Sequence, residues 1–238
     1  MTGNDLLAAY EKNWTAVREQ VKAACERVGR NSNEVRVIAV TKTVDESVLE
    51  PLLAIGLREF GENRWQQARP KLEHPLGAEG VWHFIGHLQL NKAKYIAPRF
   101  QFVHSVDSVD LATALSHYRA SQQTDPLRLL LQVNVSGEAS KSGLHPDDVV
   151  KTTKQILDLP HVVLTGLMTM APQTENMETT RPVFKGLREL RDEVSRTLGI
   201  PLPELSMGMS GDFTIAIEEG ATMVRIGRRL LQTSENLA

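Results

Sequence analysis

The sequence predicts an α/β protein built as a single (β/α)8 barrel of the TIM type, with an additional helix at its amino terminus. Candidate strands alternate with helical stretches along the chain, and the first of them, at 35–41, is a short β-branched apolar run. Its 238 residues match the usual size of one such barrel. No long or low-complexity linker divides the chain, so we expect residues 1–238 to form one domain.

The first element is an amphipathic helix over residues 5–28, where apolar residues recur at steps of three and four. Gly29 and the polar cluster at 31–33 end this helix. Strands are predicted at 35–41, 58–61, 81–86, 102–105, 128–135, 162–168, 204–207 and 223–226. Helices are predicted at 46–55, 64–73, 91–97, 108–121, 146–157, 178–198 and 212–219. Because the last strand has no helix after it, we expect the amino-terminal helix to cover that gap.

Local signals set the start of two helices. Thr43 and Glu46 have the spacing of a capping box. Pro146 and the two aspartates after it suit the first turn of a helix. Pro51 would remove a backbone hydrogen bond from the second helix, so we expect that helix to kink or to begin late.

Composition excludes several classes of protein. The net charge is −2 and the pI is about 6.4, so no bulk attraction to nucleic acid or anionic membranes is expected. Cys25 is the only cysteine, which excludes an internal disulfide and a cysteine metal site. The start of the chain lacks a basic signal-peptide region, and no apolar run is long enough to span a membrane. We therefore expect a soluble, cytoplasmic protein.

Two histidines are spaced like metal ligands. His83 and His87 are four residues apart, but Gly86 indicates a strand end and a turn between them. We therefore favour a histidine inside the barrel over a metal site.

Lys42 is the leading candidate for covalent chemistry. It follows the first apolar strand, and the carboxyl ends of parallel strands carry the active sites of α/β folds. Partial desolvation at that position would favour the neutral amine, which can condense with a carbonyl group. The alternative is a solvated lysine that happens to follow a strand.

Glycines after the last two predicted strands suggest a phosphate site. Gly208 and Gly211 flank Met209 and Ser210, and Gly227 ends the eighth strand. Small residues let backbone N–H groups approach an anion, and Ser210 adds a hydroxyl donor. Ordinary turn glycines and a helix cap explain the same pattern equally well.

Arg225 lies between two apolar residues of the eighth predicted strand and should face the barrel interior. A buried arginine stays protonated and needs an acceptor. One interpretation is an ion pair with Glu62, and the other is donation to the ring nitrogen of a heteroaromatic ligand. A lysine amine, a phosphate site and an arginine facing a ring nitrogen together describe a pyridoxal 5′-phosphate (PLP) pocket.

Several motifs are similar to those of a known family. In order, they are V-T-K-T around Lys42, F-G-E-N at 60–63, H-F-I-G-H-L-Q at 83–89, H-S-V-D-S at 104–108, S-K-S-G at 140–143, G-L-M-T-M at 166–170, and L-S-M-G-M-S-G-D through V-R-I-G. From about residue 5 to 230 the chain resembles the PLP homeostasis proteins, the YggS/PROSC group, which is related to the barrel domain of alanine racemase.

The resemblance implies a fold-type III PLP barrel in which the cofactor forms an aldimine with Lys42. It also implies that Asn63 lines the ring and that Arg225 faces the ring nitrogen. The residues that it assigns to the phosphate are Met209, Ser210 and Gly227. One position departs from the family pattern, because Arg228 stands where a threonine usually follows V-R-I-G. Arg228 could replace the missing hydroxyl with charge.

The same residues bear on catalysis. A permanent cation beside the ring nitrogen keeps that nitrogen unprotonated and weakens the ring as an electron sink, so transamination and decarboxylation are not expected. Racemases of the related fold use a second base, a tyrosine from an additional domain. The three tyrosines of this chain, Tyr10, Tyr95 and Tyr118, fall on predicted helices.

We therefore expect a PLP-binding protein of vitamin B6 homeostasis without strong catalytic turnover. The main alternative is a PLP-dependent amino-acid racemase, and a Schiff-base barrel of the aldolase type comes third. We expect a monomer that donates PLP to PLP-dependent apo-enzymes. Lys141 is either a secondary PLP acceptor or a solvated loop lysine.

Overall fold

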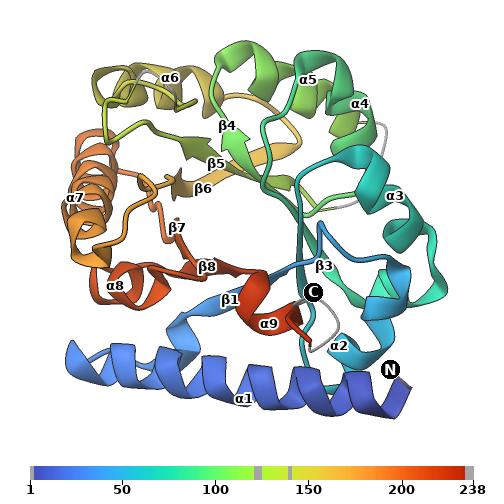
Figure 1. Ribbon diagram of the computed structural model, residues 1–238. Coiled ribbons are helices and arrows are strands. Elements are labelled where there is room, and N and C mark those ends of the chain that lie inside the picture. The colour runs from blue at the N-terminus through green and yellow to red at the C-terminus, as the bar shows by residue number, and fades with distance from the viewer. Residues whose placement is uncertain (1–2, 121–124, 139–140, 234–238) are drawn as a thin grey trace.

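Eight parallel strands form a closed barrel in sequential order in the computed structural model, which confirms the predicted fold class (Figure 1). The structure describes residues 3–120, 125–138 and 141–233. The strands are β1 (Arg36–Val40), β2 (Glu59–Glu62), β3 (Val81–Phe84), β4 (Phe102–Val106), β5 (Leu127–Gln132), β6 (Val162–Met168), β7 (Glu204–Met209) and β8 (Met223–Ile226). Pairing of β8 with β1 closes the barrel, with Ile38 opposite Arg225.

Helices surround the strands. They are α1 (Gly3–Arg27), α2 (Leu49–Ala54), α3 (Trp65–Glu73), α4 (Ala93–Ile96), α5 (Val109–Arg119), α6 (Val149–Ile156), α7 (Arg181–Leu198), α8 (Phe213–Glu218) and α9 (Arg228–Leu231). The 3₁₀ turns are η1 (Ser32–Glu34), η2 (Glu46–Val48), η3 (Pro75–Glu79), η4 (Leu90–Lys92), η5 (Pro146–Asp148) and η6 (Met177–Thr180). Each predicted strand and helix is present within a few residues, although residue 121, the predicted end of the fifth helix, lies outside the described residues. The sequence did not predict α9.

The amino-terminal helix closes the side of the barrel where the chain begins and ends. α1 packs against α2, α8 and α9, as Figure 1 shows along its lower edge. The Asn13 side-chain amide donates to the carbonyl oxygens of Leu230 at 3.0 Å and Gln232 at 2.9 Å. Arg27 pairs with Glu218 of α8. The expectation that this helix covers the gap after the eighth strand is confirmed.

Two local predictions have different outcomes. The capping box is wrong, because Asp45 caps η2 by accepting from the backbone N–H of Ser47 at 3.0 Å. Asp45 immediately precedes η2, and aspartate is a stronger N-cap than a threonine such as Thr43. The late start of the second helix is confirmed: α2 begins at Leu49, so Pro51 lies in its first turn, where no intrahelical N–H donor is needed.

The interior of the barrel is filled with side chains. Its apolar centre is formed by Ile38, Phe102, Leu130, Met168 and Met223. A separate and larger core lies between the outer faces of the strands and the helices. Because these side chains fill the centre of the barrel, a ligand could enter the barrel interior only from one of its ends.

Candidate functional site

The six residues that the sequence predicts for a cofactor lie at the carboxyl ends of four neighbouring strands. The strands are β7, β8, β1 and β2, which pair in that order. The residues are Lys42 and Asn63 after β1 and β2, Met209 and Ser210 at and after β7, and Arg225 and Gly227 in and after β8. The barrel therefore brings six residues from distant parts of the chain to one side of its mouth.

Lys42 is exposed in the turn that follows β1. The expected partial desolvation of its amine is therefore wrong for this structure. The turn lies past the last paired residues of the strand, where no neighbouring strand covers the side chain. The residue just before it is anchored firmly: the Thr41 N–H donates to the Gly61 carbonyl at 3.1 Å, and the Thr41 hydroxyl donates to Glu62 at 2.6 Å.

A buried ion pair lies outside the barrel wall beside Lys42. The Lys71 ammonium of α3 lies 2.6 Å from Glu62 Oε1 and donates to the Thr41 carbonyl at 2.7 Å. Lys71 and Glu62 have side-chain exposures of 1% and 0%. The suggested pairing of Arg225 with Glu62 is therefore wrong. Gly61 and Glu62 face opposite sides of β2, and Glu62 points away from the interior where Arg225 lies.

Asn63 is positioned by close backbone packing. A Cβ at Gly86 would lie 2.3 Å from the Asn63 carbonyl oxygen, so the β3 loop approaches Asn63 because position 86 has no side chain. The Asn63 Oδ1 atom is buried and accepts no hydrogen bond from any residue that the structure describes. A buried side-chain acceptor without a partner is costly, so this atom suits a polar ligand at the mouth.

The loop after β7 has the shape expected of an anion site, but one of its donors is already used. Gly208 has φ +89° at a register shift between β7 and β8, and a Cβ there would lie 2.6 Å from Ala216 of α8. The Met209 N–H donates to the Asp212 carboxylate at 2.6 Å. Burial raises the pKa of Asp212, while the Met209 N–H and the charge of Arg225 oppose this shift. Ser210 is half-buried beside this loop.

The end of β8 approaches β1 closely. A Cβ at Gly227 would lie 3.3 Å from the Val40 carbonyl oxygen, two residues before Lys42. Gly227 also precedes α9, whose first N–H groups have no intrahelical acceptor. Arg228 is exposed at this turn, whereas Arg229 is held by donation to Gln20 of α1 at 2.6 Å.

Arg225 faces the interior of the barrel, as predicted, and is 5% exposed. One terminal nitrogen donates to the Ser206 hydroxyl at 2.6 Å, and the other donates to the Thr169 carbonyl at 3.0 Å. Burial lowers the pKa of Arg225 to about 10, and the charge of Asp212 partly opposes this effect. The guanidinium is therefore charged at neutral pH and retains N–H groups that neither contact uses.

Sequence reasoning missed the polar groups below Arg225. Ser206 of β7 contacts His104 of β4, which contacts His83 of β3, which contacts Glu59 of β2. His83 was predicted inside the barrel and is fully buried, whereas His87 is exposed on the following loop. The alternation of inward positions on each strand was the available signal for the other residues. The structure contains no cluster of three or more histidine, cysteine, aspartate or glutamate residues suited to a metal ion among its described residues.

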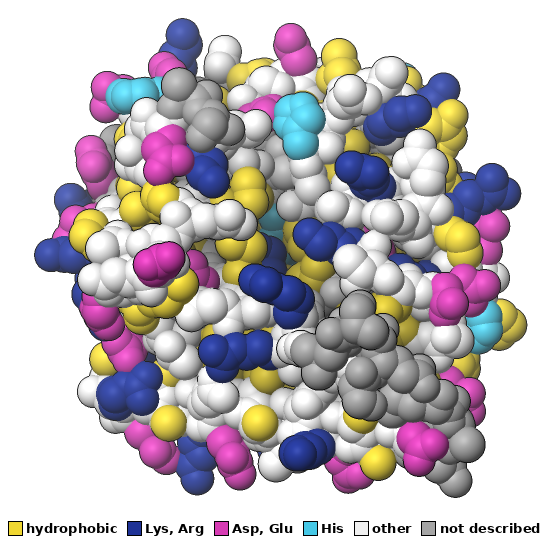
Figure 2. Space-filling model, in the orientation of Figure 1, with side chains coloured by type: hydrophobic (Ala, Val, Ile, Leu, Met, Phe, Trp, Pro, Cys, Tyr) yellow, Lys and Arg dark blue, Asp and Glu magenta, His cyan; other side chains and the backbone are white. Residues whose placement is uncertain are grey.

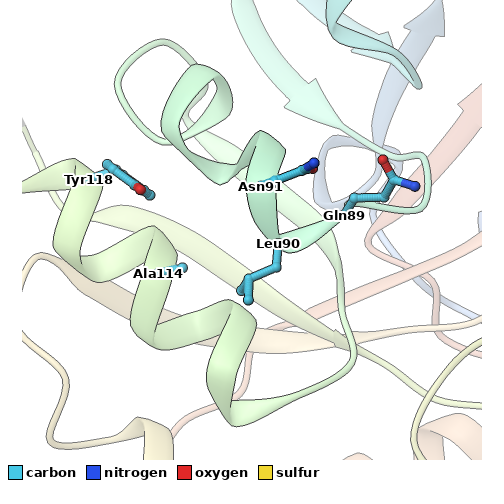
Figure 3. A pocket seen from close by; sticks show the side chains of 5 residues that line it. All are labelled: Gln89, Leu90, Asn91, Ala114 and Tyr118. Atoms are coloured by element: carbon cyan, nitrogen blue, oxygen red, sulfur yellow. The ribbon is translucent and has the colours of Figure 1, made fainter.

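The face that carries α9 is hollowed near its centre, and lysine and arginine side chains gather beside the hollow (Figure 2). A second concavity lies outside the barrel between η4 and α5 (Figure 3). Its lining residues are Gln89, Leu90, Asn91, Ala114 and Tyr118. None of these is charged, and none is a predicted cofactor residue, so the barrel mouth is the better candidate for an anionic ligand.

Comparison with known proteins identifies the family. Residues 9–234 match the family described as alanine racemase, N-terminal domain. The chain belongs to this family. A pyridoxal phosphate homeostasis protein of Aquifex aeolicus is 44% identical over 214 residues, which cover 90% of this chain and 93% of that protein. A protein of the same name in Pseudomonas aeruginosa is 41% identical, over 94% of this chain and 95% of its own.

Solved structures show the same relationship. PipY of Synechococcus elongatus, determined with PLP bound, has a TM-score of 0.80 and 31% identity, with 94% of this chain and 100% of PipY covered. Alanine racemase of Corynebacterium glutamicum has a TM-score of 0.69 at 18% identity, with 94% of this chain and 60% of the racemase covered. At that identity the likeness to the racemase shows the fold alone.

Proposed function

We propose that this chain binds PLP at the carboxyl end of the barrel, with Lys42 as the covalent attachment point, and that it acts in vitamin B6 homeostasis. The observation that carries the proposal is the convergence of four neighbouring strand ends on an exposed amine, a partnerless amide oxygen, a glycine loop and a buried arginine. The names of the relatives and the PLP-bound PipY structure support the choice of ligand.

Each residue has a distinct role in the proposal. PLP supplies an aldehyde that reacts reversibly with amines. Lys42 would offer the amine, and Asn63 would line the ring. Arg225 would donate an N–H group to the ring nitrogen from a fixed position, since Ser206 and Thr169 hold both of its terminal nitrogens.

The phosphate would be held by the loops after β7 and β8. Ser210 offers its hydroxyl, and the Gly227 turn offers backbone N–H groups near Val40. Met209 contributes less than the resemblance implies, because its N–H already donates to Asp212. Arg228 is exposed beside the same turn and adds positive charge in place of a threonine hydroxyl.

We favour a carrier over a racemase. Proton transfer on both faces of a substrate needs two bases, and the tyrosines of this chain lie on α1, α4 and α5, outside the barrel. PLP-dependent apo-enzymes are the proposed recipients. We also propose that the chain works as one domain, as a monomer and in the cytoplasm. Within the part of the chain that the structure covers, no helix has the length and apolar character needed to cross a bilayer.

The attachment site can be tested by loading the purified protein with PLP, reducing it with borohydride and mapping the labelled peptide. We expect one label, on Lys42, and loss of the visible absorption band in Lys42→Ala. Lys141→Ala is the matched control, since Lys141 lies in the loop after β5 and is the alternative acceptor. Labelling of another lysine in the wild-type protein contradicts the assignment.

The carrier can be distinguished from the racemase in deuterated water. The loaded protein is incubated with each L-amino acid, and the D-enantiomer and the α-deuterium are measured. Transfer of PLP to an apo-enzyme is timed in parallel. Inversion at rates of about 1 per second or more would favour the racemase, whereas slow deuterium exchange without inversion fits a single base.

A further inference from the structure

A continuous line of polar side chains crosses the interior of the barrel, and all of them are buried except Glu59, which is partly exposed at one end. Arg225 donates to the Ser206 hydroxyl at 2.6 Å, and Ser206 lies 2.8 Å from His104 Nδ1. His104 Nε2 lies 2.9 Å from His83 Nδ1, and His83 Nε2 lies 2.5 Å from a Glu59 carboxylate oxygen. The line therefore joins residues of five strands, β8, β7, β4, β3 and β2, and among these residues only Arg225 is a predicted cofactor residue.

The two ends of this line set the direction of every hydrogen bond in it. A guanidinium can only donate, and an ionised carboxylate can only accept. If His83 is neutral and donates from Nε2 to Glu59, its Nδ1 must accept from His104 Nε2–H. His104 Nδ1 must then accept from the Ser206 hydroxyl. Ser206 in turn accepts from Arg225, so every group in the line has one defined role.

The charges around the line favour this arrangement over its alternatives. Burial alone would raise the pKa of Glu59, but the hydrogen bond from His83 and the charges of Arg36 and Arg128 outweigh burial and lower it. Burial lowers the pKa of His83 and outweighs the opposing effect of Glu59. Burial, with the positive groups nearby, holds the pKa of His104 well below its usual range. At neutral pH the line therefore contains one carboxylate and two neutral imidazoles.

We infer that Glu59, His83 and His104 are positioning residues for Arg225, which act by fixing the direction in which the Ser206 hydroxyl points. With its proton committed to His104, Ser206 presents a lone pair to Arg225, and the guanidinium keeps one orientation toward the mouth. The effect on a ring nitrogen rests on the proposed function, whereas the hydrogen-bond order does not.

The line orients groups rather than conducting protons. A proton could move along it only if Arg225 released one, and this guanidinium remains protonated at neutral pH because its pKa is about 10. The stacking of His83 on Phe102, with ring centroids 4.5 Å apart and an angle of 11°, further restricts rotation of the imidazole. Both features suit a rigid support.

The first test reads the histidine tautomers without PLP. In ¹⁵N-labelled protein at neutral pH, long-range ¹H–¹⁵N spectra should show His83 and His104 with hydrogen on Nε2 and none on Nδ1. The two rings can be assigned through their contacts with Phe102. A hydrogen on Nδ1 of either ring, or an imidazolium, would overturn the inference. This measurement needs no variant that might fail to fold.

The second test changes the acceptor at the far end. Glu59→Met removes this acceptor, so His83 and His104 should both shift toward the Nδ1–H tautomer. The two rings must change together, because the hydrogen bond between His104 Nε2 and His83 Nδ1 needs one donor and one acceptor. Glu59→Gln keeps an acceptor oxygen and should preserve the wild-type tautomers. Glu204→Met is the matched control, since Glu204 pairs with Arg36 inside the barrel but lies outside the line. Unchanged tautomers in Glu59→Met would overturn the inference.

The last measurement connects the line to the cofactor. Glu59→Met should weaken PLP binding about three- to tenfold, the range for losing one neutral hydrogen bond, while Glu59→Gln and Glu204→Met should stay within about twofold of wild type. Equal affinity in Glu59→Met and wild type would overturn the positioning role. If the wild-type protein binds no PLP, the proposed function fails. The histidine tautomers still test the hydrogen-bond directions from Arg225 to Glu59.

Discussion

Replacing Lys71 with methionine should destabilise the protein strongly, although Lys71 lies outside the barrel. Its ammonium is 1% exposed and lies 2.6 Å from Glu62, which is fully buried. Methionine preserves most of the side-chain volume but leaves the carboxylate with the Thr41 hydroxyl as its only donor among the described residues. The other carboxylate oxygen, Glu62 Oε2, accepts no hydrogen bond from any described residue. The substitution would therefore leave a buried charge without compensation.

The expected cost is about 3–5 kcal/mol, the range for removing one member of a buried ion pair. Most of this cost comes from leaving the Glu62 carboxylate buried without a counter-charge, and little comes from the lost attraction between Lys71 and Glu62. The double variant Lys71→Met, Glu62→Gln should therefore be more stable than Lys71→Met alone, because glutamine carries no charge. Arg69→Met is a control in the same helix: Arg69 pairs with Glu73 at the surface, and such i,i+4 pairs contribute about 0.3–0.5 kcal/mol.

Urea denaturation with linear extrapolation measures these differences, provided that the m-values agree among the variants. The reasoning is refuted if Lys71→Met costs no more than Arg69→Met, or if the double variant is less stable than Lys71→Met. Because the Lys71 ammonium also holds the Thr41 carbonyl at 2.7 Å, Lys71→Met should weaken PLP binding as well. That carbonyl belongs to the peptide that joins Thr41 to Lys42.

Three further outcomes are expected. The folded state lowers the pKa of His83 and His104, so the unfolded chain binds more protons in acid. The free energy of unfolding should therefore fall as the pH drops below about 6.5, by up to roughly 1.4 kcal/mol per pH unit for each histidine, and the urea midpoint should fall with it. A midpoint that is constant from pH 7 to pH 5 would contradict this. Gly208→Ala should lower the free energy of unfolding by roughly 1–3 kcal/mol, because φ is +89° and the new Cβ would lie 2.6 Å from a side chain of α8. The control Gly211→Ala should be nearly neutral, because its new Cβ would have its nearest contact at 3.4 Å. Ser210→Ala should weaken PLP binding about 10- to 150-fold in a fluorescence titration, and unchanged affinity would exclude a direct hydroxyl contact.

The strands were predictable because each one is short and alternates with a helical stretch, and β1 is also apolar and rich in β-branched residues, as suits a strand covered on both faces. The sequence did not predict α9, which is a single helical turn. α9 contains only Arg228–Leu231, too few residues to show helical periodicity, and Asn13 of α1 fixes the end of this turn by hydrogen bonds across 217 and 219 positions in sequence. Contacts of that separation cannot be inferred from a local pattern.

The residues of the site at the strand ends could be predicted from the sequence, whereas the contacts inside the barrel could not. Lys42 and Arg225 could be placed from strand position alone, because a parallel barrel gathers its carboxyl ends. The contact between His104 and Ser206 crosses the interior from β4 to β7, over 102 positions in sequence, and depends on the register of every strand between them. Glu62 was assigned to the wrong side of its strand, because a shift of one residue in β2 reverses the direction of its side chain.

Two polar systems support the proposed site from opposite sides of the barrel wall. Outside, Lys71 and Glu62 hold the backbone immediately before Lys42. Inside, the line from Glu59 to Ser206 holds Arg225. Neither system confines Lys42 itself, whose side chain is exposed. A racemase must retain its cofactor and exclude water through many turnovers, whereas a carrier must expose its covalent linkage to a competing amine. A fixed Arg225 beside an accessible Lys42 is therefore the arrangement that the proposed carrier requires.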